Sequence, residues 1–591
     1  MKRLYLFGGT VIDVAKKIIY PADVLVQDGI ITGVLHPGET LPGDCSVLDV
    51  TGRYIAPGFI DAHIHIESSM LPPLEFARAA VPGGTTTVLV DPHEITNVFG
   101  PRAVEFFMEQ ADLVPMDMYV GIPSCVPATH LESSGAEITI DDIRRFMADR
   151  RIYGLAEMMD FPDIIRGDPA VRQKVDAVYD YGKIVDGHCP GLSGDDLAAY
   201  ISNGRNDGRV RIMNDHEATG PDEALEKLNA GMFLAIRYGS AEKNLNAILP
   251  GLIREGADLS RCMLCSDDVS AAELSRDGHV DRIIRRARDI FIETAGLAPR
   301  DAAIAAIGMA TINPARYLQR FFDFHDMPPA GQVAAGCRAN LVVLASLEKI
   351  EVHSVIRDGA IVAEKGALIS DIAHYDYSPM LKSVNVGREI TAGDFRIPAP
   401  REQGPVAARV IQAIPHSLLT GSAEMTMQAA GGEVTADPSR DIAKIAVFER
   451  HHARGSRTVA LVKGLGIRSH AIASTVAHDS HNLIVAGVDD QSMARAARYL
   501  AEKGGGMVVV LDDGEVYLPL QIGGLMSTGT IGEVASRYEE VVRASQKIGM
   551  QHENIFMTLS FISLPVIPEL KITDRGLVDV GKFDFVPLFL S

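Results

Sequence analysis

Short apolar segments alternate with amphipathic segments through the first half of this chain, and this alternation limits the possible folds more than any other feature. TTTVLVDP, from Thr85, and MFLAIRYGS, from Met232, are typical of buried strands, whereas GPRAVEFFMEQAD, from Gly100, has apolar residues at helical spacing. With PGFIDAHIHIESS, at 57–69, the pattern gives about eight strand-then-helix units over about 250 residues, which is the size of a (β/α)₈ barrel. The sequence therefore predicts an α/β fold with a distorted TIM-like barrel over residues 57–329.

Both sides of the predicted barrel have a different pattern. LYLFGGTVIDVAKKIIYPADVLVQDGIITGVLHPG, from Leu4, and GCRANLVVLASLEKIEVHSVIRDGAIVAEKG, at 336–366, alternate β-rich runs with Gly, Asp-Gly and Pro-Gly turns. Such runs are typical of antiparallel hairpins. We expect residues 1–56 and 330–395 to form one β-sandwich domain that flanks the barrel.

A third region follows a polar, proline-rich segment. FRIPAPREQGP, from Phe395, has the composition of a linker. Beyond it, NLIVAGVDDQSMARAARYLAEKGGGMVVVLDDG, from Asn482, has the pattern of a strand, a helix and a second strand. We therefore expect a separate C-terminal α/β domain over residues 400–591.

Charge and hydropathy exclude several classes of protein. The formal net charge of −21 argues against a nucleic-acid backbone or an anionic membrane as the main partner. Gly8, Gly9 and Asp13 interrupt the N-terminal segment before the apolar core of a signal peptide could form, and no apolar run is long enough for a transmembrane helix. The six cysteines do not form a disulfide framework, and we expect Cys262 and Cys265 to be buried strand residues. The expected protein is cytoplasmic and, by the commonest default, a homodimer.

Polar residues mark the ends of the predicted strands. In a barrel the carboxyl ends of the strands meet at one rim, where the chemistry takes place. Taken alone, a strand-terminal Asp or His commonly caps the next helix, and an H-x-H pair such as His63 and His65 is more often an ordinary surface or core feature. Together, imidazoles and carboxylates on one rim match the ligands of Zn²⁺, Mn²⁺ or Fe²⁺. The strand-end residues are His63, His65, Asp91, His93, Glu157, His188, Asp215, His216, Glu217, Asp267 and Asp268.

Several motifs resemble a known family. PGFIDAHIHIE, together with His188, His216 and Asp267, is similar to the metal site of the amidohydrolase superfamily, whose members are metal-dependent hydrolases on a distorted (β/α)₈ barrel with a flanking β-sandwich. More narrowly, GGTTTVLVDPHEITNVFG, NDHEATGPDEALEKL and IASTVAHDSHNLIVAGVDDQSM resemble the bacterial adenine deaminases. This resemblance extends over nearly the whole chain and includes the C-terminal region.

The resemblance implies a site for a divalent metal, with two ions per subunit, Mn²⁺ or Fe²⁺, and Zn²⁺ as an alternative. Glu157 would bridge the two ions, where cyclic-amide hydrolases of the superfamily use a carboxylated lysine. The segment RIYGLAEMMD, which contains Glu157, has no lysine. The first ion would be held by His63, His65 and Asp267, and the second by His188 and His216.

The implied reaction is the hydrolytic deamination of adenine to hypoxanthine and ammonia, in which a metal-bound hydroxide attacks C6. Asp267 would transfer the proton to the leaving amino group, and Glu157 is the alternative, since a carboxylate beside the substrate can do either job. The other implied site residues are His93, which would assist the attack, and Glu67, Asp268, His478 and Asp479, which would bind the purine.

Three alternatives stay open. The segment VAHDSHN, which contains His478 and Asp479, also has the pattern of a polar loop stabilised by its own side chains. The whole chain could be a metal-dependent amidohydrolase that acts on another amino-heterocycle or on a cyclic amide. It could also be a non-catalytic barrel that serves as a binding module.

Overall fold

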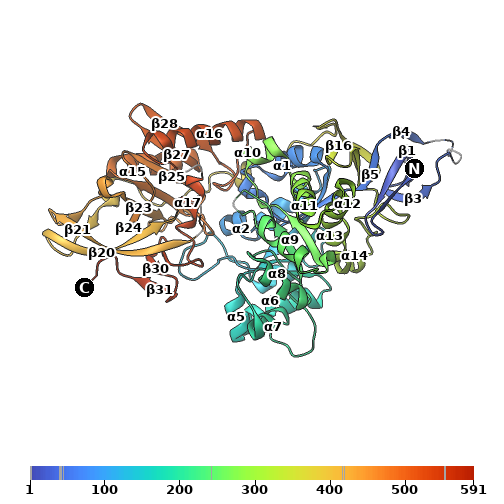
Figure 1. Ribbon diagram of the computed structural model, residues 1–591. Coiled ribbons are helices and arrows are strands. Elements are labelled where there is room, and N and C mark those ends of the chain that lie inside the picture. The colour runs from blue at the N-terminus through green and yellow to red at the C-terminus, as the bar shows by residue number, and fades with distance from the viewer. Residues whose placement is uncertain are drawn as a thin grey trace.

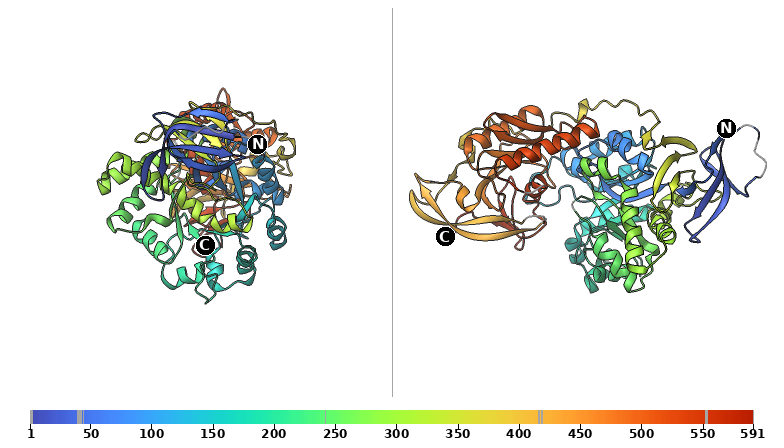
Figure 2. Two further views of the ribbon diagram at one scale, coloured as in Figure 1. Left: turned by 90° about the vertical axis from the view of Figure 1, so that its right-hand side faces the viewer. Right: turned by 45° about the horizontal axis from the view of Figure 1, so that its top comes forward.

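The computed structural model of the chain describes residues 3–38, 43, 45–240, 242–414, 417, 419–551 and 554–590. The end points 1 and 591 of the domains expected from the sequence lie outside these residues. Three parts lie in a row in Figure 1, with an N-terminal sheet at the right, the barrel in the centre and the C-terminal part, orange to red, at the left. The right panel of Figure 2 shows the same order, so the two ends of the chain lie at opposite ends of the molecule.

Parallel strands in the centre of the molecule form the predicted barrel. They are β6 (Phe59–His65), β7 (Thr85–Val90), β8 (Asp117–Pro123), β9 (Ile152–Met158), β10 (Ile184–Gly187), β11 (Asn214–Asp215), β12 (Phe233–Arg237), β13 (Cys262–Cys265) and β14 (Asp267–Asp268). One sheet has the order β10-β9-β8-β7-β6-β14 and a second has the order β11-β12-β13. The sheets join because β14 directly follows β13, and because the Met213 N–H, beside β11, donates to the Val185 carbonyl of β10 at 2.9 Å. The predicted α/β class with a barrel is confirmed.

Helices follow the barrel strands along the chain and cover them. They are α1 (Pro73–Ala80), α2 (His93–Phe99), α3 (Pro101–Ala111), α4 (Ile140–Phe146), α5 (Phe161–Arg166), α6 (Pro169–Asp180), α7 (Gly194–Ile201), α8 (Pro221–Asn229), α9 (Leu245–Arg254), α10 (Ala271–Asp277), α11 (Val280–Ala295), α12 (Pro299–Met309), α13 (Ile312–Tyr317) and α14 (Gln319–Phe324). In α11 the residues Val280, Ile284 and Ala287 are buried at intervals of three and four, which places them on one face of the helix. The helix ends at Gly296, whose φ of 64° is the left-handed conformation that glycine adopts without strain.

Segments from both sides of the barrel pair in one flanking sheet. Its strands are β1 (Arg3–Asp13), β2 (Ile18–Gln27), β3 (Ile30–Leu35), β4 (Ser46–Asp49), β5 (Tyr54–Pro57), β15 (Leu341–Ser346), β16 (Glu351–Arg357), β17 (Ala360–Glu364) and β18 (Ala367–Leu368). The order is β18-β17-β16-β15-β5-β1-β2-β3, with β4 paired to β1. The antiparallel pair β5–β15, in which Ala56 lies opposite Val342, joins the two chain segments, so this flanking domain has two parts that are distant in the sequence.

The C-terminal part is built on a mixed sheet. Its strands are β19 (Ile397–Pro398), β20 (Gln403–Ala413), β21 (Thr420–Ala430), β22 (Glu433–Val434), β23 (Ile442–Phe448), β24 (Arg457–Lys463), β25 (Ala471–Ser474), β26 (Leu483–Gly487), β27 (Gly506–Leu511) and β28 (Gly514–Pro519). The order is β19-β22-β21-β20-β24-β23-β26-β25-β27-β28. The remaining elements are α15 (Asp490–Lys503), α16 (Ile531–Lys547), α17 (Ile555–Phe561), β29 (Leu570–Ile572), β30 (Leu577–Asp579) and β31 (Asp584–Val586). Since α15 packs on β25, β26 and β27, this part has its own α/β core.

The segment before β19 packs with the C-terminal part. Val386, Ile390 and Phe395 share a buried cluster with Phe448 and Leu483. Our expectation from the sequence placed these three residues in the flanking sheet domain. We therefore propose that the C-terminal domain begins before residue 386 rather than at 400, because apolar contacts and not the proline-rich segment set this boundary.

Two further expectations concern membrane helices and cysteines. Among the described residues, none of the helices combines the length and the apolar character that crossing a membrane requires. Cys262 and Cys265 are buried in β13, as expected, and burial raises the pKa of both thiols.

Candidate metal centre and adjoining cavity

The carboxylate of Glu157, at the end of β9, is surrounded by histidines from three other strands or strand ends. Its Oε1 lies 3.0 Å from Nε2 of His65 and 3.4 Å from Nε2 of His63, both on β6. Its Oε2 lies 2.7 Å from Nδ1 of His188, which follows β10, and 3.5 Å from Nε2 of His216, which follows β11. The two oxygens of one carboxylate therefore face two different pairs of imidazoles.

Asp267 completes the group on the side of β6. Its Oδ1 lies 3.3 Å from Nε2 of His65 and 3.7 Å from Nε2 of His63. Its Oδ2 lies 3.2 Å from Nη1 of Arg237, which ends β12. Because Arg237 holds Oδ2, only Oδ1 of Asp267 faces the histidines.

These separations fit a divalent metal ion. An ion bound at about 2.0–2.2 Å to each ligand keeps neighbouring donor atoms about 3.0–3.6 Å apart. The Nε2 atoms of His63 and His65 lie 3.1 Å apart, within that range. Among the described residues, Oε1 of Glu157 is buried without a hydrogen-bond partner. A buried acceptor of this kind is satisfied when it binds a cation.

The charges at the site show how protons and a metal ion would compete for the same atoms. Burial alone lowers the pKa of His63, but the carboxylates of Asp186 and Glu157 outweigh it and raise that pKa to about 10. Burial raises the pKa of Glu157, but His216 above all holds it well below its usual range. The carboxylate is therefore ionised, and the imidazoles would release protons when a metal ion binds.

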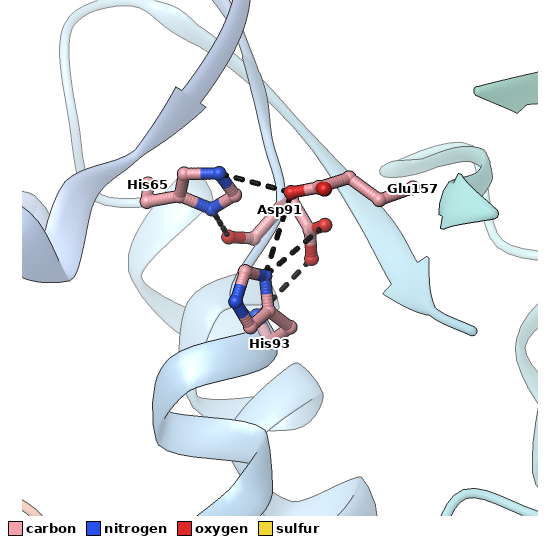
Figure 3. A group of neighbouring side chains, drawn as sticks. All are labelled: His65, Asp91, His93 and Glu157. Carbon is pink, nitrogen blue, oxygen red and sulfur yellow. Dashed lines mark hydrogen bonds and ion pairs between the residues drawn. The ribbon is translucent and has the colours of Figure 1, made fainter. Parts of the chain in front are cut away.

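His93 lies beside this group, at the first position of α2 (Figure 3). Its Nδ1 lies 3.6 Å from Oε1 of Glu157 and 3.4 Å from Oδ2 of Asp91. The Asp91 carbonyl lies 3.0 Å from Nδ1 of His65, which fixes the orientation of that ring. On its other side, Nε2 of His93 lies 3.3 Å from Oε1 of Glu94. His93 therefore connects the candidate metal ligands with Glu94.

A cavity lies between the barrel and the C-terminal part. The candidate metal ligands do not line it, but Glu94, which contacts His93, is one of its lining residues. Most of its walls are apolar, and they include Met70, Met507, Leu525 and Phe556. Of the predicted substrate-binding residues, Glu67 and His478 line the cavity, whereas Asp268 and Asp479 are not among its lining residues. Asp268 instead accepts a hydrogen bond from Ser68, which does line it, and Oδ1 of Asp479 lies 3.7 Å from Nδ1 of His478.

Two known sequence families match the chain. The amidohydrolase family matches residues 54–362, and the adenine deaminase C-terminal domain matches residues 417–584. An adenine deaminase of Methanothrix thermoacetophila is 42% identical over 588 residues, which cover 100% of this chain and 97% of that protein. This chain belongs to the adenine deaminase family. A second family member, from Geobacillus kaustophilus, is 37% identical over 591 residues and covers 99% of this chain and 96% of its own.

The predicted resemblance to the adenine deaminases and to the wider amidohydrolases is confirmed by these matches. Among solved structures, a β-aspartyl dipeptidase from Fervidobacterium islandicum AW-1 aligns with a TM-score of 0.47 at 16% identity and covers 63% of this chain and 100% of its own. Members of the amidohydrolase family are metal-dependent hydrolytic enzymes. The histidines and carboxylates around Glu157 could hold a metal ion, which agrees with the metal dependence of the family.

Sequence reasoning did not single out two charged residues, Glu94 and Arg237, that contact predicted site residues. Glu94 follows His93 in DPHE, and its Oε1 lies 2.7 Å from Nδ1 of His478 in the C-terminal part. Arg237 lies in the predicted strand segment MFLAIRYGS and is the last residue of β12. It pairs with Asp267. Both residues stand at or just after a strand end, which is the signal that could have identified them.

Asp215, a strand-end residue, points away from the candidate ligands. Its Oδ2 lies 2.8 Å from Nζ of Lys227, and its Oδ1 accepts a hydrogen bond from the Cys189 N–H at 2.9 Å. Nζ of Lys227 also donates to the Cys189 carbonyl at 2.8 Å. Asp215 and Lys227 therefore tie together the ends of β10 and β11, after which His188 and His216 follow.

Proposed function

We propose that this chain hydrolyses adenine to hypoxanthine and ammonia through attack of hydroxide on C6. The observation that carries the proposal is the position of Glu157, whose two oxygens face two pairs of histidines. His93 and Glu94 connect this group with a mainly apolar cavity. Membership of the adenine deaminase family supports adenine as the substrate. Apolar walls suit the two faces of a purine ring, and a few polar lining groups suit its nitrogen edge.

We propose two divalent ions per subunit, Mn²⁺ or Fe²⁺, with Zn²⁺ as the alternative, because imidazole and carboxylate ligands suit all three. When bound, such ions supply the Lewis acidity that lowers the pKa of water toward about 7 and makes hydroxide available at neutral pH. The residues that would hold them are His63, His65 and Asp267 for one ion, His188 and His216 for the other, and Glu157 for both.

The chain's own residues would guide the attack and the proton. His93, whose Nδ1 lies 3.6 Å from Oε1 of Glu157, can orient the attacking oxygen. Although burial raises the pKa of Asp267, His65 and Arg237 hold it well below its usual range, so Asp267 is ionised and can accept a proton. Asp267 takes the proton that the attacking water loses, and the C6–O bond forms. Asp267 then passes that proton to the amino group, and the C6–N6 bond breaks with loss of ammonia. Glu157 is the alternative proton carrier.

The polar residues of the cavity would bind the nitrogen edge of the purine. Burial raises the pKa of Glu67 to about 8, and a protonated carboxyl group there would donate a hydrogen bond to a ring nitrogen. His478 lines the same cavity. Asp268 would act through Ser68, and Asp479 through His478, since each contacts that lining residue.

The proposal is tested by incubating Mn²⁺-loaded protein with adenine and measuring hypoxanthine by its absorbance and ammonia by a coupled assay. We expect both products in equal amounts, and loss of activity in a matched His63→Asn variant. A panel with other aminopurines, cytosine and hydantoin tests the substrate. If one of these compounds is turned over faster than adenine, that compound and not adenine is the substrate. If the protein holds two ions but turns over none of the compounds, it is a non-catalytic barrel.

We also propose that the enzyme is a homodimer of the cytoplasm, which is the expectation from the sequence. Light scattering coupled to size-exclusion chromatography would measure the mass of the assembly. A mass equal to that of one chain would contradict the dimer.

A further inference from the structure

Glu94 is a barrel residue whose carboxylate is enclosed by the C-terminal domain. It is the second residue of α2 and is only 3% exposed. Its Oε1 lies 2.7 Å from Nδ1 of His478 and 3.3 Å from Nε2 of His93, and its Oε2 pairs with Nε2 of His481. His478 and His481 belong to the connection between β25 and β26. A carboxylate of one domain is therefore held by imidazoles of another.

The proton of the His481 ring has a defined position. Nδ1 accepts a hydrogen bond from the Ala477 N–H at 3.2 Å, so Nδ1 has no proton and Nε2 carries the proton that faces Glu94. Burial lowers the pKa of His481, which agrees with a neutral ring. A metal ion between Glu94, His478 and His481 would need the proton of His481 on Nδ1 instead. The geometry therefore favours hydrogen bonds to Glu94 over a third metal ion.

His478 and His481 also contact other residues of the C-terminal domain. The guanidinium of Arg450 is fully buried, donates from Nε to the His481 carbonyl, and donates from Nη2 to the Gly523 carbonyl at 2.9 Å. The ring of His478 stacks on Phe561 with centroids 4.8 Å apart and planes 7° apart. The backbone of His481 and the ring of His478 are therefore held by contacts other than those with Glu94, so less side-chain entropy is lost in the contact with Glu94.

The C-terminal domain contacts α2 by a second route, through the connection that follows β8. The Ser133 N–H donates to Oδ1 of Asp574 at 2.9 Å, and Nδ2 of Asn482 donates to the Ser133 carbonyl at 2.9 Å. The next residue, Ser134, donates to Oδ1 of Asn97 on α2 at 2.9 Å. The C-terminal domain thus fixes the helix that begins with His93 from two sides.

We infer that the C-terminal domain is part of the active site, with His481 and His478 as positioning residues that hold Glu94 and, through Glu94, hold the ring of His93 toward Glu157. In either charge state of His93, a proton on Nε2 can be donated to Glu94, which leaves Nδ1 facing Glu157. This inference rests on the proposed function, because adenine turnover is its readout.

A double-mutant cycle tests the inference in the full-length, metal-loaded protein. We expect His481→Leu to lower kcat/KM for adenine by about 10- to 100-fold, since it removes a hydrogen bond to a charged group. Glu94→Gln should lower kcat/KM at least as much. In the Glu94→Gln background, His481→Leu should cost less than about 2-fold, because residues that act as one unit are not additive.

Two further variants separate positioning from folding. His481→Gln keeps an amide N–H near the Nε2 position, so we expect it to recover activity to within about 5-fold of the wild type. The matched control is His470→Asn, in the same domain, where the histidine lies 3.4 Å from Asp512 and has a φ of 59° that asparagine tolerates. The control should keep wild-type activity, and elemental analysis should find the same metal content in every variant.

Several outcomes would overturn the inference. Wild-type kcat/KM in His481→Leu, or effects of His481→Leu and Glu94→Gln that multiply, would show that His481 does not act through Glu94. Loss of one metal ion per chain in His481→Leu would show a third metal site instead. Wild-type protein that does not deaminate adenine overturns the proposed function together with this inference, whereas active wild-type protein with an insensitive His481 overturns this inference alone.

Discussion

Lys227→Met is predicted to weaken one of the two metal positions and leave the other in place. Lys227 is fully buried, and its Nζ donates to Oδ2 of Asp215 and to the Cys189 carbonyl, both at 2.8 Å. Cys189 follows His188 in the sequence, and Asp215 precedes His216, so one ammonium group connects the two segments that place these histidines. Without it, the pair should lose its fixed separation, while His63 and His65 on β6 should not move.

The expected loss of folding free energy follows from the groups that still surround Asp215 in the variant. Methionine fills a similar volume but leaves the carboxylate of Asp215, which is fully buried, without a cation. Removing one partner of a buried ion pair costs about 3–5 kcal/mol of folding free energy. The N–H groups of Cys189, Glu217 and Ala218 still donate to Asp215, at 2.9, 3.1 and 2.9 Å, so the lower half of that range, about 3–4 kcal/mol, applies. For a unit of the barrel's size this lowers Tm by roughly 6–16 °C.

Metal titration and thermal unfolding would measure both effects. We expect the ion at His188 and His216 to bind about 10- to 100-fold more weakly, as when a group that orients a metal ligand is removed. The ion at His63 and His65 should bind as in the wild type. The matched control is Lys243→Met, because Lys243 is 43% exposed and its pair with Glu273, at 3.2 Å, lies on the surface. Lys227→Met protein that binds both ions as tightly as the wild type and unfolds within about 2 °C of it would refute this reasoning.

Three further predictions concern charged groups at the site. Glu157→Gln should leave fewer than two metal ions per chain by elemental analysis and lower kcat/KM by roughly 1,000-fold or more, because an amide cannot bridge two cations; full metal content would exclude the bridging role. Although burial lowers the pKa of His478, Glu94 raises it to about 10, so the pair stabilises the fold fully below the unfolded pKa of about 6.5 and loses its contribution as the pH rises toward 10. The difference in Tm between the wild type and His478→Gln should therefore shrink between pH 6.5 and 10, and a constant difference would contradict the charged pair. Arg237→Met should raise the pKa of Asp267 and move the acidic limb of the kcat/KM profile to higher pH, whereas an unchanged limb would favour Glu157 as the proton carrier.

The barrel was predictable because its strands and helices have different hydrophobic periods. Segments such as TTTVLV are buried along their whole length in β7, as expected of a parallel strand covered on both faces. The domain boundary that we propose before residue 386 was not predictable in this way. Val386, Ile390 and Phe395 lie in a segment with little regular structure, and only the position of Phe448 and Leu483 shows which core they join.

The candidate metal ligands could be found from the sequence because each stands at the end of a strand. The carboxyl ends of parallel barrel strands meet at one rim, so His63, His188 and His216 had to lie close together once the barrel was recognised. Glu94 and Arg237 were missed for a physical reason. Their positions at or just after a strand end mark them as candidates, but their partners lie at long range, His478 for Glu94 and Asp267 for Arg237, and no local pattern shows such pairs.

The sequence by itself determined the barrel, the strand-end residues and the family, because periodicity and strand order depend on local spacing and on the topology that it implies. Only the tertiary structure decided which oxygen of Glu157 faces which histidines, that Asp215 binds Lys227 and not a metal ligand, and that the C-terminal domain encloses Glu94. These are questions of side-chain direction and of contact between distant segments. They are settled by packing, which brings His481 against a residue that lies far from it in the sequence.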